Sequence, residues 1–116
     1  MRLQSIRRGD VFLLKPSDAK GKPIPGERPV AVIQNDLANA FSPATIVAAI
    51  RRDIRKGLPV HVGIPKKTGA LPGGSIIDCG MLATVASKTL GSRLARLPSS
   101  CMEKVDQALK IALSLT

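Results

Sequence analysis

The amino-acid sequence predicts an α+β fold that is mostly β: a small, strongly curved sheet of short antiparallel strands closed towards a barrel, with one helix at the C-terminus. Three observations support this prediction. Several short segments are rich in β-branched residues, turn-forming Gly and Pro separate them, and an apolar stripe at helical spacing comes last. At 116 residues the chain has room for one core, so residues 1–116 are expected to form a single domain.

The first half of the chain is expected to hold three strands, one long loop and a short helix. Asp10–Lys15 is apolar and follows Gly9, which suits a strand entered from a turn. Residues 15–28 are rich in Pro and Gly amid polar residues, the composition of a loop. β-branched residues alternate with others around 30–32 and 45–49, which predicts two more strands. Between them, one helical turn is expected at Asp36–Phe41.

The second half is expected to supply the remaining strand pairing. Arg51–Gly57 is interpreted as a basic connection, and turn residues separate the segments that follow it. Those segments are the predicted strands, Val60–Ile64, Ser75–Cys79, Leu82–Val85 and Arg93–Leu97.

The last segment predicts a helix. Ser100 and Glu103 have the spacing of a capping box, in which the hydroxyl and the carboxylate each accept from an amide of the first turn. An apolar stripe at helical spacing follows, formed by Met102, Val105, Leu109 and Ala112. We expect this stripe to pack in the core or at a dimer contact.

The charge balance indicates an anionic partner. There are 18 Lys and Arg against 8 Asp and Glu, which gives a formal net charge of +10 and a pI near 10.5. Such an excess attracts polyanions through phosphate neutralisation and counterion release. A solvated basic surface is the alternative, but so large an imbalance in a short chain favours a nucleic acid or an acidic protein. Phe12 and Phe41 are the only aromatic residues, so binding would depend on Arg, Lys and backbone groups rather than on base stacking.

Composition also argues against several classes of protein. Cys79 and Cys101 are the only cysteines, and with the single histidine they cannot complete an ordinary four-ligand zinc site. We expect both thiols to be reduced and buried, and we expect no metal or other cofactor. No apolar run approaches the roughly 20 residues that span a bilayer, and the basic N-terminus does not have the pattern of a signal peptide. A cytoplasmic protein without a membrane partner is expected.

Six blocks, in a fixed order and spacing, carry more specific information than any of these features. They are Arg7–Phe12, Arg28–Asp36, Ser42–Ile50, Leu58–Val62, Leu90–Leu94 and Val105–Leu109. Together they resemble the MazF/PemK family of toxin endoribonucleases. The resemblance implies an SH3-like barrel with a packed helix, acting as a homodimer. It also implies cleavage of single-stranded mRNA without ribosome or metal, in a groove along the dimer face, and a cognate antitoxin whose acidic, disordered tail fills that groove.

The resemblance points to Arg28 as the leading catalytic residue. Cleavage by the neighbouring 2′-hydroxyl, which leaves a 2′,3′-cyclic phosphate, needs proton transfer at two oxygens and positive donors around the transition state. The family gives the arginine at this position acid or base duty. From chemistry alone its role is charge stabilisation and phosphate orientation, because a guanidinium stays protonated. The structural alternative is an ion pair with Glu27, Asp36 or a dimer neighbour.

Arg51 is the second catalytic candidate and the main departure from the family. Relatives usually have Thr or Ser here, whose hydroxyl holds the scissile phosphate. Three alternatives stay open for Arg51. It could contact the phosphate as a second cation, strengthen RNA binding while cleavage slows, or be a solvated loop residue.

The RNA-binding candidates are cations of the two loops and one polar residue kept from the family's Glu-Gln-Ile-Arg-Thr segment. They are Lys22, Arg52, Arg55 and Thr84. The first loop and residues 80–83 lack most of the polar side chains that would read base edges, so the RNA sequence preference should differ from that of familiar members.

His61 is the only histidine, but its strand context favours a half-buried, sheet-facing residue over a catalytic one. Asn35-Asp36 is interpreted as a structural turn. Two functional alternatives remain open. One is a catalytically silent RNA- or antitoxin-binding regulatory member of the same fold, and the other is a topoisomerase poison of the CcdB type.

Overall fold

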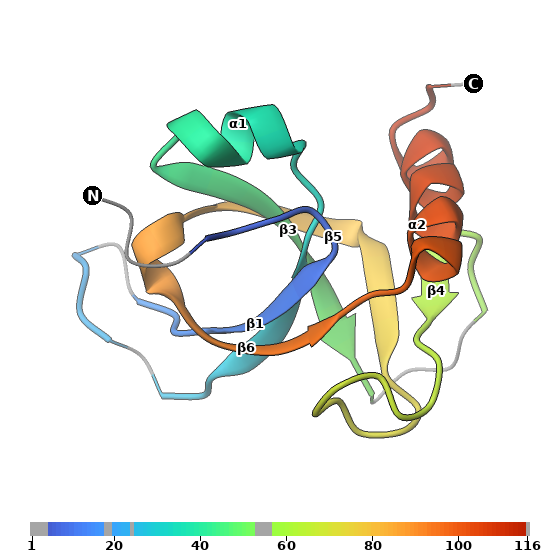
Figure 1. Ribbon diagram of the computed structural model, residues 1–116, viewed down its shortest axis with the longest axis horizontal. Coiled ribbons are helices and arrows are strands. Elements are labelled where there is room, and N and C mark those ends of the chain that lie inside the picture. Colours follow the sequence, from blue (N-terminus) through green and yellow to red (C-terminus); the bar gives the residue numbers. More distant parts are fainter. Residues whose placement is uncertain (1–4, 18–19, 24, 53–56, 116) are drawn as a thin grey trace.

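The computed structural model describes residues 5–17, 20–23, 25–52 and 57–115. Within these residues it contains six strands, two α-helices and a short 3-10 helix, η1 (Figure 1). In chain order the elements are β1 (Asp10–Leu14), β2 (Arg28–Val32), α1 (Asp36–Phe41), β3 (Ala44–Arg51), β4 (His61–Gly63), β5 (Ile76–Ala86), η1 (Ser87–Thr89), β6 (Leu90–Arg96) and α2 (Ser99–Ala112).

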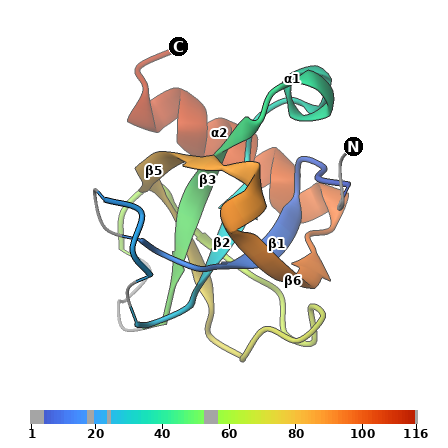
Figure 2. The same ribbon diagram turned by 90° about the vertical axis from the view of Figure 1, so that its left-hand side faces the viewer.

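The strands form one antiparallel sheet in the order β4-β5-β3-β2-β1-β6. The three residues of η1 connect β5 to β6, although these two strands are far apart in this order. β5 ends at Ala86 beside β3, and β6 begins at Leu90 beside β1. So short a link is possible only because the sheet curls until its two ends approach each other (Figure 2). The predicted mostly-β fold, a small barrel with a C-terminal helix, is confirmed.

Strand alternation divides the core between two faces of the curled sheet. The first face packs against α2. Its buried residues include Val11, Ala31, Ala48, Ile77, Cys79 and Ala95 from the strands, with Cys101, Val105 and Ala108 from the helix. The second face holds a separate cluster, formed by Ile6, Phe12, Val30, Val32, Val47 and Leu90. Burying both faces explains why β-branched residues dominate these short strands.

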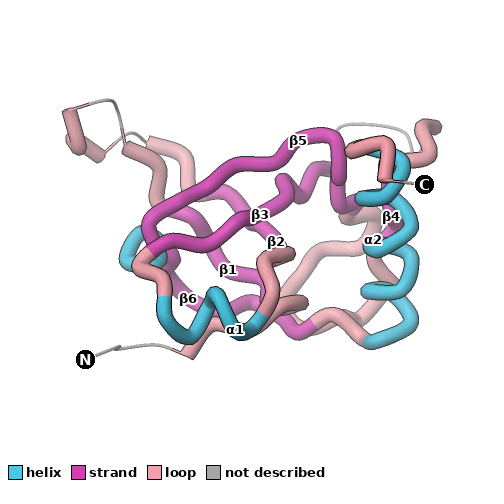
Figure 3. The backbone as a smooth tube through the Cα atoms, turned by 90° about the horizontal axis from the view of Figure 1, so that it is seen from above, coloured by secondary structure: helices cyan, strands magenta, loops and turns pink. Residues whose placement is uncertain are grey.

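β5 differs from the prediction of two separate strands over 75–79 and 82–85. It is one strand of 11 residues, running beside β3 along most of its length (Figure 3). The register shifts inside it, because Ala48 pairs with Leu82 whereas Ala49 pairs with Asp78. Residues 79–81 therefore form a bulge, which bends the strand without ending it. Gly80 lies in the middle of this bulge.

α1 forms where one helical turn was predicted, and its N-terminus is capped as expected of the Asn35-Asp36 turn. The side chain of Asn35 accepts a hydrogen bond from the Ala38 amide at 2.8 Å. Asn39 is 2% exposed and accepts from the Thr45 hydroxyl at 2.7 Å, which fastens the helix to β3. The short helix thus sets the approach of the chain into β3.

α2 begins two residues earlier than the capping box predicted, at Ser99 instead of Cys101. It follows the extended Pro98 and has no side-chain cap, and the Cys101 amide donates to the Pro98 carbonyl at 3.0 Å. The predicted capping box is wrong, because Ser100 already lies inside the first turn and Glu103 lies beyond it. Proline suits this entry, since its fixed φ is compatible with the extended cap position.

Other boundaries shift by a few residues. β4 is shorter than Val60–Ile64, and β6 begins at Leu90 instead of Arg93. The helix stripe is also rotated, because Val105 is fully buried while Leu109 is only partly so. No helix within the described parts of the chain combines the length and apolar character needed to cross a membrane.

Candidate active site

Arg28 stands at the start of β2, on an exposed position. Val30, two residues further along β2, is buried on the second face of the sheet. Because residues i and i+2 of a strand share a face, Arg28 lies on this second face at the start of the strand. Within the described residues Arg28 has no ion-pair partner, and Asp36 instead accepts a hydrogen bond from the Arg8 amide at 2.7 Å. The ion-pair alternative with Glu27 or Asp36 therefore finds no support, and the guanidinium is placed to meet an external anion.

Arg51 is the last residue of β3, so it belongs to a strand and not to the basic connection in which it was first placed. Val30 pairs with Ala49 across β2 and β3. Continuing this antiparallel register by two residues sets Arg28 opposite Arg51, and opposite residues share a face of the sheet. The fold therefore brings the two predicted catalytic residues together at the ends of neighbouring strands.

The Arg51 side chain is held by contacts from β5. Its Nη1 lies 3.7 Å from Oδ2 of Asp78 and donates to the sulfur of Met81 at 3.4 Å. About a third of the side chain is exposed, whereas the Asp78 side chain is nearly buried. The solvated-loop alternative for Arg51 is therefore wrong.

Asp78 also contacts His61 on the edge strand β4, with which it pairs in register. Nε2 of His61 lies 3.7 Å from Oδ2 of Asp78, and the other carboxylate oxygen accepts from the Gly80 amide at 2.9 Å. Nδ1 of His61 accepts from the amides of Gly57 and Leu58, each at 3.4 Å. As predicted, His61 is a half-buried strand residue.

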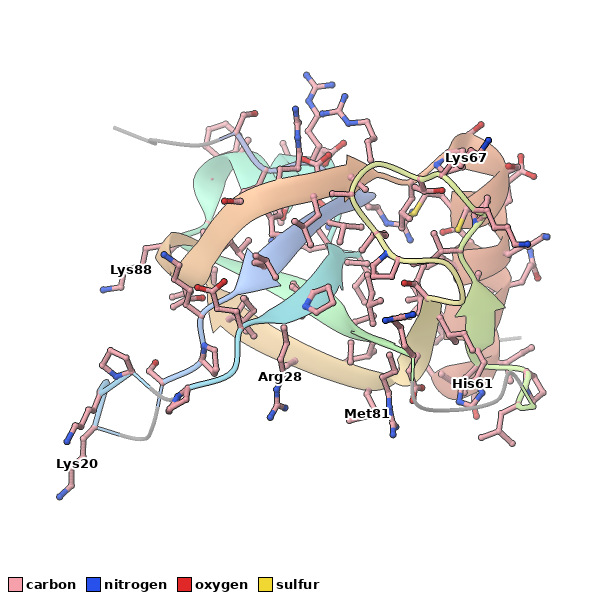
Figure 4. All side chains as sticks on the ribbon, turned by 90° about the horizontal axis from the view of Figure 1, so that it is seen from below. Lys20, Arg28, His61, Lys67, Met81 and Lys88 are labelled. Carbon is pink, nitrogen blue, oxygen red and sulfur yellow. The ribbon has the colours of Figure 1, made fainter. Side chains whose placement is uncertain are left out.

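Asp78 was not among the sequence-predicted site residues. The available signal was a single charge inside the apolar run Ile76–Cys79, because a carboxylate in a buried strand needs a partner. Its partners come from β3 and β4, which a single sequence does not align. Figure 4 shows Arg28, Met81 and His61 along one side of the molecule, with the loop that carries Lys20 projecting beside them.

The two thiols are free and buried, as predicted. Burial, followed by the negative charges of Asp78 and Cys101, raises the pKa of the Cys79 thiol to about 11, against a smaller opposing effect of Arg8. Burial also raises the pKa of Cys101, opposed by Lys104. Both thiols are protonated at neutral pH, so neither serves as a nucleophile there.

The RNA-binding candidates are distributed unevenly. Lys22 is exposed on the loop between β1 and β2, and Arg52 is exposed immediately after β3. Arg55 lies outside the residues that the structure describes. Thr84 is exposed on β5 opposite Ile46, which places it on the first face, away from Arg28. Lys22 and Arg52 thus belong to the same end of the sheet as the arginine pair, and Thr84 does not.

Two grooves formed by described residues include neither arginine of the pair. One of them, of about 550 Å³, lies between β4 and α2, and its walls include Pro59, His61, Val62, Lys104, Gln107 and Ile111. Among the described side chains, no group of three or more His, Cys, Asp or Glu could hold a metal ion. The site is therefore a cationic strand end with one buried carboxylate behind it.

Comparison with known proteins places this arrangement in a family. Endoribonuclease EndoA of Bacillus subtilis is 41% identical over 111 residues, covering 95% of this chain and 96% of the relative. An endoribonuclease solved with its cognate antitoxin from a mycobacterial species superposes with a TM-score of 0.79 at 22% identity, covering 96% and 97% of the two chains. A MazE–MazF structure from Deinococcus radiodurans gives 0.79 at 18% identity, covering 97% and 99%. These two solved structures have the same fold as this chain.

The family model for the PemK-like, MazF-like toxin of type II toxin-antitoxin systems matches residues 7–113. This span includes every described strand and helix and both arginines of the pair. The chain belongs to the PemK-like, MazF-like family of type II toxin-antitoxin toxins.

Proposed function

We propose that this toxin-family endoribonuclease cuts single-stranded mRNA, without a ribosome, at the ends of β2 and β3, with Arg28 as the principal catalytic residue. The observation that carries the proposal is the exposed Arg28 guanidinium opposite Arg51, in a chain 41% identical to an endoribonuclease. Two adjacent guanidinium groups on one face suit a phosphodiester, because each can donate two parallel hydrogen bonds to phosphate oxygens.

The proposed reaction is an internal transesterification. The 2′-oxygen attacks the neighbouring phosphorus, and the bond from phosphorus to the 5′-oxygen breaks. The 2′-hydroxyl loses its proton and the leaving oxygen gains one, so the products are a 2′,3′-cyclic phosphate and a 5′-hydroxyl. Arg28 stabilises the extra negative charge on the phosphorane-like transition state. The family resemblance adds proton transfer to this role.

Arg51 supplies the second cation in this proposal. It stands where relatives have a small hydroxyl, and its carboxylate contact keeps it at the strand end opposite Arg28. A cation there binds the scissile phosphate and interacts more strongly with the additional negative charge of the transition state. Lys22 and Arg52 extend the positive surface along the RNA strand, while Arg55 and Thr84 remain candidate contacts from the sequence alone.

The proposed protein partner is a cognate antitoxin with an acidic, disordered segment. The net charge of +10 supports it, and so do the names of two solved relatives of the same fold, one described as an endoribonuclease with its cognate antitoxin and one as MazE–MazF. We also propose a homodimer, in which exposed apolar residues such as Leu37 and Phe41 offer surface for contact. Its RNA substrate would place the protein in the cytoplasm.

Cleavage in the absence of metal is the direct test. Purified protein incubated with a long unstructured RNA in EDTA is expected to produce fragments that end in a 2′,3′-cyclic phosphate. Phosphatase should remove this terminal phosphate only after acid has opened the ring, and phosphatase alone should not. An RNA that is bound but uncut would favour the catalytically silent alternative, for which replacement of the family hydroxyl by Arg51 is the supporting observation. RNA that is neither bound nor cut would contradict the whole proposal.

RNA binding is expected to weaken steeply with salt. Three arginines already have carboxylate partners elsewhere: Arg93 and Arg96 share the buried Asp10, and Arg8 pairs with Asp106. About four phosphate contacts at the strand ends predict a logarithmic slope of about −2.8, hence a loss of about 50-fold in affinity between about 50 and 200 mM salt. Fluorescence anisotropy with a labelled non-cleavable deoxy-substituted strand measures this slope, and salt-independent binding would contradict the electrostatic model.

A further inference from the structure

We infer that Asp78 is a positioning residue for Arg51: its buried carboxylate holds the guanidinium at the end of β3, so that this chain uses a carboxylate-anchored arginine where its family uses a hydroxyl. The inference rests on the proposed function, because it concerns how Arg51 meets the scissile phosphate. It assigns a role to a residue that makes no contact with RNA itself.

The geometry distinguishes Asp78 from an ordinary surface partner. Asp78 is 6% exposed, and one carboxylate oxygen is fixed by the Gly80 amide at 2.9 Å within the β5 bulge. The other oxygen faces Nη1 of Arg51 and Nε2 of His61, each at 3.7 Å. The bulge therefore fixes the carboxylate from one side, and β3 and β4 bring the two nitrogen groups to it from the other.

A fixed carboxylate limits the conformations of the Arg51 side chain before it binds a phosphate. A free arginine side chain has many rotamers and loses their entropy when it binds a phosphate. An arginine already held at one nitrogen needs less reorganisation, and preorganised charge is what stabilises a transition state. His61 contacts the same carboxylate oxygen, and its Nδ1 accepts hydrogen bonds from the amides of Gly57 and Leu58. The cluster thus runs from β4 through β5 to the strand end that bears Arg51.

The pair also accounts for two unusual residues together. At the end of β3 a long cation stands where the family resemblance implies a small hydroxyl, and a lone carboxylate lies in an apolar strand beside it. The carboxylate alone would be unfavourable, because a nearly buried charge needs a partner of opposite sign. Present together, the two charges satisfy each other and leave the guanidinium at the surface.

A double-mutant cycle tests the inference. Asp78→Asn keeps the shape of the side chain and removes its charge. With Arg51 present, it should lower kcat for cleavage of a short single-stranded RNA about tenfold, with a smaller effect on KM. In the Arg51→Thr variant the same substitution should leave kcat where it was, because no guanidinium remains to be positioned. An equal loss in both backgrounds, or no loss in either, would overturn the inference.

Chemical rescue gives a second readout that a purely structural role would not move. In Arg51→Ala, millimolar guanidinium ion should restore part of the cleavage rate, because Asp78 can bind it in the vacated place. In Arg51→Ala/Asp78→Asn the same addition should restore nothing, and equal rescue in both variants would contradict the positioning role. Failure of the parent protein to cut RNA would overturn the proposed function itself, whereas parental cleavage that is unaffected by Asp78→Asn would overturn only this inference.

Discussion

Arg28→Ala is expected to lower kcat for RNA cleavage by about 10² or more while the protein stays folded. The residue is exposed at the start of β2 and, within the described part of the chain, makes no ion pair that the fold would lose. Its removal takes a positive donor away from the developing negative charge on phosphorus. Single-turnover cleavage of a short RNA measures the rate, and circular dichroism with thermal melting checks the fold.

Two controls separate the chemistry from loss of charge. Arg28→Lys keeps the charge but not the two-pronged donor, so it should recover only part of the rate. Lys110→Ala removes one exposed cation from α2, remote from the strand ends, and should leave kcat unchanged. If Arg28→Ala cut RNA at the parental rate, Arg28 would not be the principal catalytic residue.

The fold was predictable in its main outline because its signals are local. An apolar run after Gly9 marked β1, alternation of β-branched residues marked β2 and β3, and the segment between these two strands was predicted as the helical turn α1. The errors have physical causes. A bulge joins two predicted strands into β5, and α2 begins after Pro98 without a side-chain cap, where a sequence motif suggested one. Bulges and caps depend on the tertiary partners of a segment, which a local pattern does not contain.

The site was predictable to the extent that the family resemblance reached it. Arg28 and Arg51 were identified from their blocks, but their opposition follows from the β2–β3 register, which depends on the curled sheet. Asp78 and its contact with His61 could not be found in this way, because β4 and β5 pair across a long turn-rich connection. The β3–β5 register places Thr84 on the other face of the sheet from Arg28, which its position in a recognised segment did not reveal.

Substitution of Arg51 tests whether this arginine contacts the scissile phosphate in place of the family's hydroxyl. Arg51→Ala is expected to weaken RNA binding and to lower the cleavage rate by about 10², because the second cation at the phosphate is lost. Arg51→Thr restores the hydroxyl of the family and should keep or raise the rate despite the loss of charge. Filter binding with a deoxy-substituted strand and single-turnover cleavage of its ribose counterpart measure the two quantities separately.

The structure adds a stability effect that both Arg51 variants share. Each removes the arginine beside the Asp78 carboxylate and leaves the His61 ring as its neighbour. The loss should cost about 1 kcal/mol and lower the melting temperature by a few degrees, since Arg51 is partly exposed. Adding Asp78→Asn to Arg51→Thr should restore the melting temperature without slowing cleavage, because the hydroxyl needs no carboxylate to hold it. If both Arg51 variants instead bind and cut RNA like the parent, Arg51 makes no contact with the phosphate, and the pair on β3 and β5 serves only the fold.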